Sequence, residues 1–401
     1  MKIVSNKKIS TFILSSVAAA VLTACGGGSN SSSAPVTPPV AAVVANQLYT
    51  ETNQSANAIL HMTRSATDGT LTYVDKAFTN SSGTDGFGPA GTAVPADDLA
   101  SQYSVTVSTD NTKLFAVNAA SNSISVFSIN ATTGSLTLLK TIQVAGNFPN
   151  SLTYSKGYLY ASFTGTTADI NSPMVAAYQV NSDGSLNQVD SYALPRTGTT
   201  TPAAFIPTQV LASPNGAFVL VGSKSGEVIS LPINNNGGFG AAVVNTTTGL
   251  NAPFAGTFLS NTIYLSTDAA SASLASYTIS ATGALTSINI VANTQAASCW
   301  LSITPNGKFA YVGNGSGTIS SYSISPTGTI TLLNATAANE GIAVAGDSWI
   351  SADGKYLYTA YLHAGVVLSY TINADGTLTK TGAPVPSTPI PNGTMQGLVG
   401  I

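Results

Sequence analysis

Side chains capable of acid–base or nucleophilic chemistry are scarce in this chain. Charged residues make up 7% of its 401 residues, with two histidines, His61 and His363, and two arginines, Arg64 and Arg196. Hydrolytic chemistry needs a base to activate water and a donor to hold the developing oxyanion. Arg196, in a loop, is the better candidate for binding an anionic group, and Glu340 is the better candidate acid because its loop precedes a predicted strand. We expect Arg64, at a strand end, to be solvated, and both histidines to be structural or surface residues.

The two cysteines have different expected roles. Cys25 ends the phrase Leu-Thr-Ala-Cys, after three leader lysines and an apolar segment, residues 12–21, too short to span a membrane. This pattern resembles a bacterial lipoprotein signal, in which the Cys25 thiol is acylated and the residue becomes the N-terminus; an ordinary signal peptide is the alternative. Gly26 at the next position favours outer-membrane sorting. Cys299, beside Trp300, is expected to be a buried hydrophobe.

A repeated phrase predicts the fold. An aromatic strand, a second strand and a Gly turn return seven times, with turn glycines at Gly69, Gly134, Gly184, Gly237, Gly283, Gly328 and Gly376. A period of roughly 40–50 residues with several strands per unit predicts an all-β, seven-bladed β-propeller. We therefore divide the chain into a lipoprotein signal peptide (1–24), a lipidated Cys with a flexible Gly/Ser/Pro-rich tether (25–46) and the propeller (47–401).

The strand pattern also predicts how the ring closes. In the sixth repeat we expect strands at 298–304, 309–313, 319–325 and 330–334, running from the inner to the outer edge. The first repeat lacks an inner strand, whereas residues 392–401 read as an inner strand with no blade after it. The C-terminal strand is therefore predicted to complete the N-terminal blade, which would cover the open sheet edges.

One repeat carries an insertion. The first glycine interval is 65 residues, about 15 longer than the others, and the excess lies in the Gly-, Pro- and Ser-rich residues 79–100. This segment is either a functional loop or a tolerated surface insertion. Asp85, Asp97 and Asp98 could offer oxygens to Ca²⁺, but no known calcium-loop motif surrounds them. No zinc spacing, P-loop or dinucleotide motif is present, so we expect neither a metal nor a cofactor.

The mouth of the central channel is the expected ligand site of this architecture. Polar, mostly uncharged residues occupy the positions at or just before the predicted inner strands: Gln102, Asn150, Gln209, Ser298, Asp347 and Gln396. This set suits hydrogen bonding to a neutral polar ligand such as a sugar. Alternatively, it only solvates the pore.

The repeats resemble the lactonase-like seven-bladed propellers, which include the 6-phosphogluconolactonase-type lactonases and the carboxymuconate cyclases. The resemblance rests on residues 114–129 (LFAVNAASNSISVFSI), 302–319 and 351–372, and covers roughly residues 47–401. It implies a central-channel site with a His, an Arg and a Glu, the His following a Gly-x-x-Pro segment. In the matching segment, residues 146–150, Asn150 stands where that His is expected, and an amide cannot accept the proton that a base must take.

These observations leave two hypotheses for function. The first is a lipid-anchored propeller of the cell envelope that binds a small polar ligand or an envelope protein. The alternative is a lactone hydrolase with an altered active site that uses Arg196 or Glu340. After removal of the leader the chain has 10 basic and 16 acidic residues, a net charge of −6 with no basic run, so nucleic acid is not an expected partner.

Overall fold

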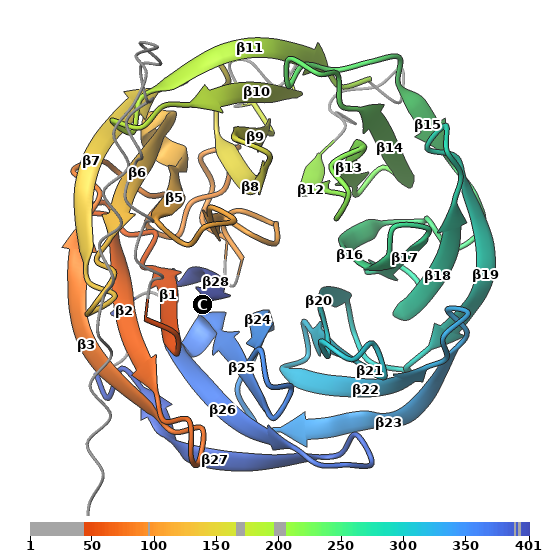
Figure 1. Cartoon of the computed structure of the whole chain (residues 1–401). Coiled ribbons are helices and arrows are strands. Elements are labelled where there is room, and N and C mark those ends of the chain that lie inside the picture. The colour runs from red at the N-terminus through yellow and green to blue at the C-terminus, as the bar shows by residue number, and fades with distance from the viewer. Residues whose placement is uncertain (1–43, 95–96, 166–172, 196–205, 389, 392–393) are drawn as a thin grey trace, which may run out of the picture. The chain divides into compact units, whose positions relative to one another are not determined.

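The computed structural model shows seven four-stranded antiparallel sheets arranged as the blades of a ring (Figure 1). The structure describes residues 44–94, 97–165, 173–195, 206–388, 390–391 and 394–401. The signal peptide, Cys25 and nearly all of the tether lie outside these ranges, and so does Arg196. No helix in the described ranges has the length and hydrophobicity that crossing a bilayer requires.

Each blade is a sheet whose strands follow one another from the channel outward. They are β28, β1, β2 and β3 in blade 1 (Gln396–Gly400, Gln47–Glu51, Ala58–Arg64, Leu71–Phe78); β4 to β7 in blade 2 (Val105–Val107, Lys113–Asn118, Ser123–Ile129, Leu136–Gln143); β8 to β11 in blade 3 (Pro149–Ser155, Tyr158–Phe163, Met174–Val180, Leu186–Ala193); β12 to β15 in blade 4 (Pro207–Ala212, Phe218–Ser223, Glu227–Pro232, Val243–Asn245); β16 to β19 in blade 5 (Pro253–Ser260, Ile263–Asp268, Ser273–Ile279, Leu285–Ala292); β20 to β23 in blade 6 (Ser298–Ile303, Phe309–Asn314, Thr318–Ile324, Ile330–Asn339); and β24 to β27 in blade 7 (Ala345–Ile350, Tyr356–Tyr361, Val366–Ile372, Leu378–Val385). Short 3₁₀ helices, η1 (Ala119–Ser121) and η2 (Leu362–Ala364), join β5 to β6 and β25 to β26.

The ring closes as the sequence predicts. β28 pairs antiparallel with β1, with Leu48 opposite Gly400 and Tyr49 opposite Val399. The Ile401 N–H donates to the Gln47 carbonyl at 2.9 Å. The first and last strands therefore share blade 1, and the strand prediction for blade 6 is confirmed except that β23 continues to Asn339.

The turn glycines connect neighbouring blades. Gly237 has φ +80°, and a Cβ atom added there would overlap the ring of Tyr158 in blade 3. Gly69 has φ +72° and lies against the Tyr356 ring of blade 7 in the same way. The hydroxyl of Tyr358 also donates to the Gly69 carbonyl at 2.9 Å. The glycines are therefore required twice, for the left-handed backbone and for the close approach of an aromatic side chain.

Arg64 and His61 both lie inside blade 1. The Arg64 side chain is 7% exposed, its Nη2 lies 3.8 Å from Asp353 Oδ2, and its guanidinium stands over the Tyr356 ring. The prediction that Arg64 is solvated was wrong, because the adjoining blade covers the strand end. His61 is fully buried, with Nε2 2.7 Å from Gln47 Oε1 and Nδ1 3.1 Å from Asp75 Oδ1. Burial lowers the pKa of His61 and the Asp75 carboxylate opposes this shift, as for a histidine held in the protein interior.

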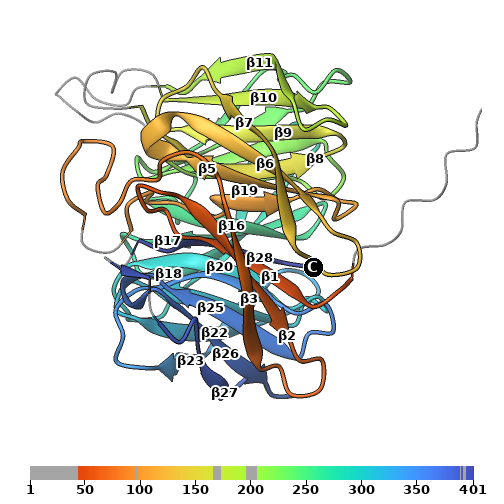
Figure 2. The ribbon, with the colours of Figure 1, turned by 90° about the vertical axis from the view of Figure 1, so that its left-hand side faces the viewer.

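The long connection after β3 does not stay on the surface. Its first part projects from one side of the blades (Figure 2). Asp98, near the start of the last part, ties the two parts together: its Oδ2 accepts hydrogen bonds from Thr84 Oγ1 and the Gly86 N–H, each at 3.0 Å. Its last part, residues 97–104, turns into the centre of the ring ahead of β4 (Figure 1). We call residues 97–104 the plug.

Candidate functional site in the central channel

The plug is hydrogen-bonded to blades on several sides of the channel. The Gln102 amide bonds to both backbone groups of Leu301, donating to the carbonyl at 3.0 Å and accepting from the N–H at 2.9 Å. The Gln102 N–H donates to the Thr208 carbonyl, and the Tyr103 N–H donates to Asp347 Oδ1, both at 3.0 Å. Blades 4, 6 and 7 therefore hold two consecutive plug residues.

Blade 3 adds further contacts to the plug. Ser101 Oγ donates to the Asn150 carbonyl, and Ser151 Oγ donates to the Gln102 carbonyl, both at 2.6 Å. The Leu152 N–H donates to the Tyr103 carbonyl at 2.8 Å. These contacts lie at the beginnings of the inner strands, so the plug fills that end of the channel.

The six residues predicted at the channel mouth all lie where the inner strands begin, or in the plug, and all are buried. Instead of facing a pore, three of them connect parts of the protein. Gln209 Nε2 donates to the Gly256 carbonyl at 3.1 Å, joining blades 4 and 5, and Ser298 Oγ donates to Asn314 Oδ1 at 3.1 Å within blade 6. Gln102 joins the plug to blade 6. A ligand-binding role for this set stays a prediction.

Asn150 has a structural role in the position where the resemblance implies a catalytic His. Its Nδ2 donates to the Pro207 carbonyl at 2.7 Å, and its Oδ1 accepts from Ser162 Oγ at 2.8 Å. A weaker contact of 3.4 Å joins Nδ2 to the Leu99 carbonyl. The amide therefore connects blade 3 to blade 4 and to the plug, and it has no titratable proton.

The other sequence candidates are not part of the channel in the described residues. Glu340 Oε2 pairs with Lys380 Nζ of β27 at 2.5 Å, and the Tyr370 hydroxyl of β26 donates to Glu340 Oε1 at 3.3 Å. Glu340 is thus engaged with the two outer strands of blade 7. Cys299 is buried, and burial raises its thiol pKa far above the ordinary value, which is consistent with the predicted hydrophobic role.

Three carboxyl groups lie around the plug, and sequence reasoning named Asp347 and Asp97 among its candidates but missed Glu51. Burial raises the pKa of Glu51 to about 8 and that of Asp347 to about 7. Burial also raises the pKa of Asp97 to about 6, although the positive charge of Lys224 opposes this shift. No sequence signal marks Glu51, since it occupies an ordinary strand position. Among the described residues, no group of three or more His, Cys, Asp or Glu is placed to hold a metal ion.

A pocket of about 320 Å³ occupies the other end of the channel. Its walls come from later positions of the seven inner strands, and Tyr103 of the plug forms part of its lining. The walls combine hydroxyl side chains with apolar ones: Thr106, Thr153, Thr257, Ser302 and Ser348 beside Val105, Leu152, Leu211, Ile303, Trp349, Ile350, Leu398 and Val399. We call this the channel pocket.

The chemistry of the channel pocket is that of a neutral binding site. Trp349 is half-buried and stacks on Tyr358, with ring centroids 5.9 Å apart. Tyr103 is the one ionisable side chain among the described residues that line the pocket, and burial raises its pKa to about 12. The described lining therefore offers hydroxyl donors and acceptors and an indole side chain, and it contains no residue that acts as a general base at neutral pH.

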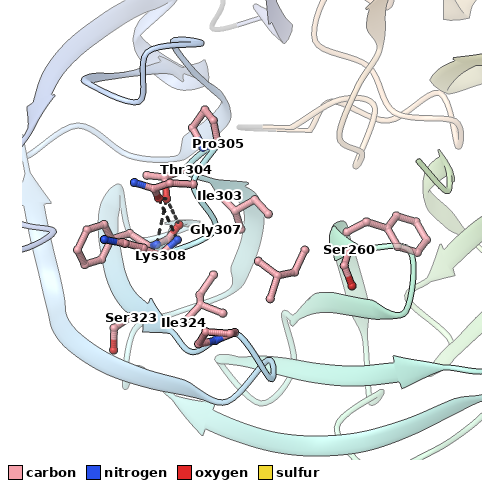
Figure 3. A pocket seen from close by; sticks show the side chains of 13 residues that line it. Ser260, Ile303, Thr304, Pro305, Gly307, Lys308, Ser323 and Ile324 are labelled. Carbon is pink, nitrogen blue, oxygen red and sulfur yellow. Dashed lines mark hydrogen bonds between the residues drawn. The ribbon is translucent and has the colours of Figure 1, made fainter. Parts of the chain in front are cut away.

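A larger cleft of about 820 Å³ lies between blades 5 and 6 (Figure 3). It is lined by the β20–β21 turn, which includes Thr304, Pro305 and Lys308, and by Phe258 and Ile324. The turn is held internally, with Thr304 Oγ1 donating to Asn306 Oδ1 at 2.8 Å. Lys308 is the one charged side chain in this described lining, so the cleft carries no catalytic constellation.

Comparison with known proteins agrees with this architecture. The family model described as lactonase, 7-bladed beta-propeller, matches residues 57–163 and 262–395. A solved structure of a candidate 6-phosphogluconolactonase from Bacteroides fragilis is 17% identical, with a TM-score of 0.65 over 91% of this chain and 100% of the other.

Two further solved structures share the fold. The periplasmic gluconolactonase of Pseudomonas aeruginosa is 16% identical, with a TM-score of 0.64 over 84% of this chain and 97% of its own. A Lactobacillus plantarum protein reaches a TM-score of 0.68 at 16% identity, over 89% and 100% of the two chains. Among curated protein sequences, none matches this chain. At these identities the structural likeness describes the fold.

Proposed function

Because this chain belongs to the lactonase family of seven-bladed β-propellers, we propose that it is a lipid-anchored member that binds a small neutral polar ligand in the channel pocket without hydrolysing it. The proposal rests on the side chains found at the two ends of the channel. One end is filled by the plug and by the Asn150 amide, and the pocket at the other end has hydroxyl and indole groups where a hydrolase needs a base.

The ligand class follows from the lining of the channel pocket. A volume of about 320 Å³ admits a ligand about as large as a single sugar ring. The Trp349 face suits the apolar face of such a ring, and the five Ser and Thr hydroxyls can exchange hydrogen bonds with its hydroxyl groups. An anionic ligand would meet no cationic side chain among the described lining residues.

Calorimetric titration with neutral monosaccharides tests this assignment. We expect saturable binding that Trp349→Ala weakens by at least about tenfold, which corresponds to about 1.4 kcal/mol. Lys308→Ala, which changes the cleft between blades 5 and 6, is the matched control and should bind as the wild type does. If Trp349→Ala and the wild type bind the sugar with equal affinity, the channel pocket is not the binding site.

The lipid anchor is part of the proposal and is supported by the sequence around Cys25. Acyl chains on this residue would hold the propeller at a membrane of the cell envelope, with residues 26–46 as the tether. An envelope protein is the other partner that such a location allows.

Lactone hydrolysis is the second candidate, because family membership and the two lactonase-type neighbours fit a possible lactonase. A panel of sugar and aromatic lactones separates the two candidates. Turnover above the uncatalysed rate that is lost in Arg196→Ala or Glu340→Gln would replace the binding-only assignment. Absence of turnover together with monosaccharide binding would support it.

A further inference from the structure

Four buried polar side chains gather at the inner edge of blade 1, and three of them carry atoms without hydrogen-bond partners. The four are Glu51 of β1, Ser104 of the plug, Asp347 of β24 and Gln396 of β28, each at most 1% exposed. Within the described part of the chain, Glu51 Oε1, Asp347 Oδ2 and both amide atoms of Gln396 lack a partner, whereas the Ser104 hydroxyl is within hydrogen-bonding reach of the Glu51 carboxyl group. Buried polar atoms are almost always paired, so such a concentration indicates that something absent from the protein itself satisfies them.

The four side chains converge, although they are far apart in sequence. Glu51 is directly opposite Gln396 in the β1–β28 pair. A hydrogen bond with the Ser104 side chain lowers the pKa of Glu51, and the negative charge of nearby Asp347 raises it. The Gly397 backbone is also next to both Ser104 Oγ and the Asp347 carboxyl group. We call these residues the Glu51–Asp347 cluster.

The polar side-chain atoms of the cluster are mainly oxygens. Two carboxylates, an amide carbonyl and a hydroxyl are the ligand types that hard cations such as Ca²⁺ take. The ion pairs described elsewhere in the chain involve other carboxyl groups. Two neighbouring buried carboxylates repel each other and are costly to ionise without a compensating charge.

We propose that the Glu51–Asp347 cluster binds a hard cation of the Ca²⁺ class, with Glu51 Oε1, Asp347 Oδ2, Gln396 Oε1 and Ser104 Oγ as protein ligands. The cation joins the plug to blades 1 and 7, the two blades that meet where the ring closes. It therefore fixes the segment that carries Tyr103 into the channel pocket. The site is separate from the proposed ligand pocket and does not depend on that assignment.

The alternative is that the Glu51–Asp347 cluster binds only water and that both acids are protonated. The two arrangements predict opposite effects of replacing the acids by amides. With a bound cation, Glu51→Gln and Asp347→Asn each remove a ligand and abolish stabilisation by Ca²⁺. With water alone, Ca²⁺ has no effect on either the wild type or the variants.

The experiment is calorimetric titration of the purified full chain with CaCl₂, MgCl₂ and NaCl after removal of bound metal by a chelator. We expect one saturable Ca²⁺ site per chain, and a loss of more than about tenfold in Ca²⁺ affinity in Glu51→Gln and in Asp347→Asn. Glu227→Gln is the matched control, because Glu227 Oε2 is another unpartnered carboxylate oxygen but lies in β14 of blade 4. This control should bind Ca²⁺ as the wild type does.

A second measurement needs no variant and covers the case in which a substitution impairs folding. Ca²⁺ should slow amide hydrogen exchange of the wild type in residues 97–104 and in β28 more than elsewhere, because the cation joins these two segments. No saturable Ca²⁺ binding by the wild type, unchanged affinity in both amide variants, or exchange protection confined to other blades would each overturn the proposal.

Discussion

Two buried carboxyl groups at the channel have pKa values well above those of free side chains. Glu51 and Asp347 lie at the channel with their pKa values raised by burial, and Asp97 lies near them. Asn150, in contrast, is a neutral amide with its hydrogen bonds satisfied. The channel thus retains acids in its interior, while the position that the family resemblance assigns to a base holds none.

The raised carboxyl pKa values predict a pH dependence of stability in the absence of added metal. Folded Glu51 and Asp347 hold their protons to about pH 8 and 7, whereas unfolded carboxyl groups release theirs near pH 4. The folded state therefore binds more protons in this window, and stability should fall as pH rises from about 4.5 to 8. Thermal unfolding in chelator at several pH values measures this slope.

The double variant Glu51→Gln/Asp347→Asn is the control for that slope, because it keeps side-chain size and removes both titrations. We expect its melting temperature to change less between pH 5.5 and 8.5 than that of the wild type. Parallel curves for the two proteins would show that other groups produce the pH dependence.

A pair of glycines separates backbone strain from packing. Gly237 and Gly157 have similar positive φ values, +80° and +90°, but an added Cβ at Gly237 would overlap Tyr158, whereas at Gly157 it would meet open space. Gly237→Ala should therefore destabilise the protein by about 1–3 kcal/mol more than Gly157→Ala does. Urea unfolding measures the free energy of unfolding of both variants. Equal losses of stability would mean that the positive φ alone, without the contact to Tyr158, accounts for the need for glycine at position 237.

At the scale of elements, the plug and β28 determine the interior of the ring. β28 supplies the inner strand of blade 1, and residues 97–104 join blades 3, 4, 6 and 7 through backbone and amide contacts. Most of these contacts come from residues 101–103, which follow the 79–100 insertion directly, so whether the insertion itself is functional or neutral stays an open prediction.

Removal of β28 tests the closure of the ring. Deletion of residues 396–401 exposes an edge of β1 and removes the buried Leu398, so we expect the melting temperature to fall by about 10 °C or more. Circular dichroism during heating measures the change. Deletion of six residues from the tether, residues 28–33, is the control, and an equal loss in both deletions would contradict the role assigned to β28.

At the scale of the whole molecule, the prediction concerns where the propeller is held. Substitution Cys25→Ala removes the thiol that the lipoprotein pattern requires, so labelled palmitate should no longer be incorporated and the protein should leave the membrane fraction. Cys299→Ser is the control because this buried residue lies in the propeller. Label that persists in Cys25→Ala would refute acylation at this position.

Three features of the fold could be predicted from the sequence: the number of blades, most strand positions in blade 6 and the sharing of blade 1 by the two ends. These features follow from local properties: alternation of side chains along a strand, turn glycines with positive φ, and a repeat length. The sequence also identified Asn150 as a departure from the family pattern, since a motif is a local feature as well.

The contents of the channel became apparent only from the folded structure. Glu51, Ser104, Asp347 and Gln396 come from four separate segments. Position before an inner strand marked Asp347 and Gln396 as channel residues, but nothing in the local sequence marked Glu51 or Ser104 or showed that the four side chains meet. Arg64 likewise ends a strand as an exposed residue would, but blade 7 covers it. Burial, raised pKa values and the path of residues 97–104 arise from contacts between segments distant in sequence, which exist only once the ring has closed. Local periodicity therefore specifies the blades, and their assembly specifies the site.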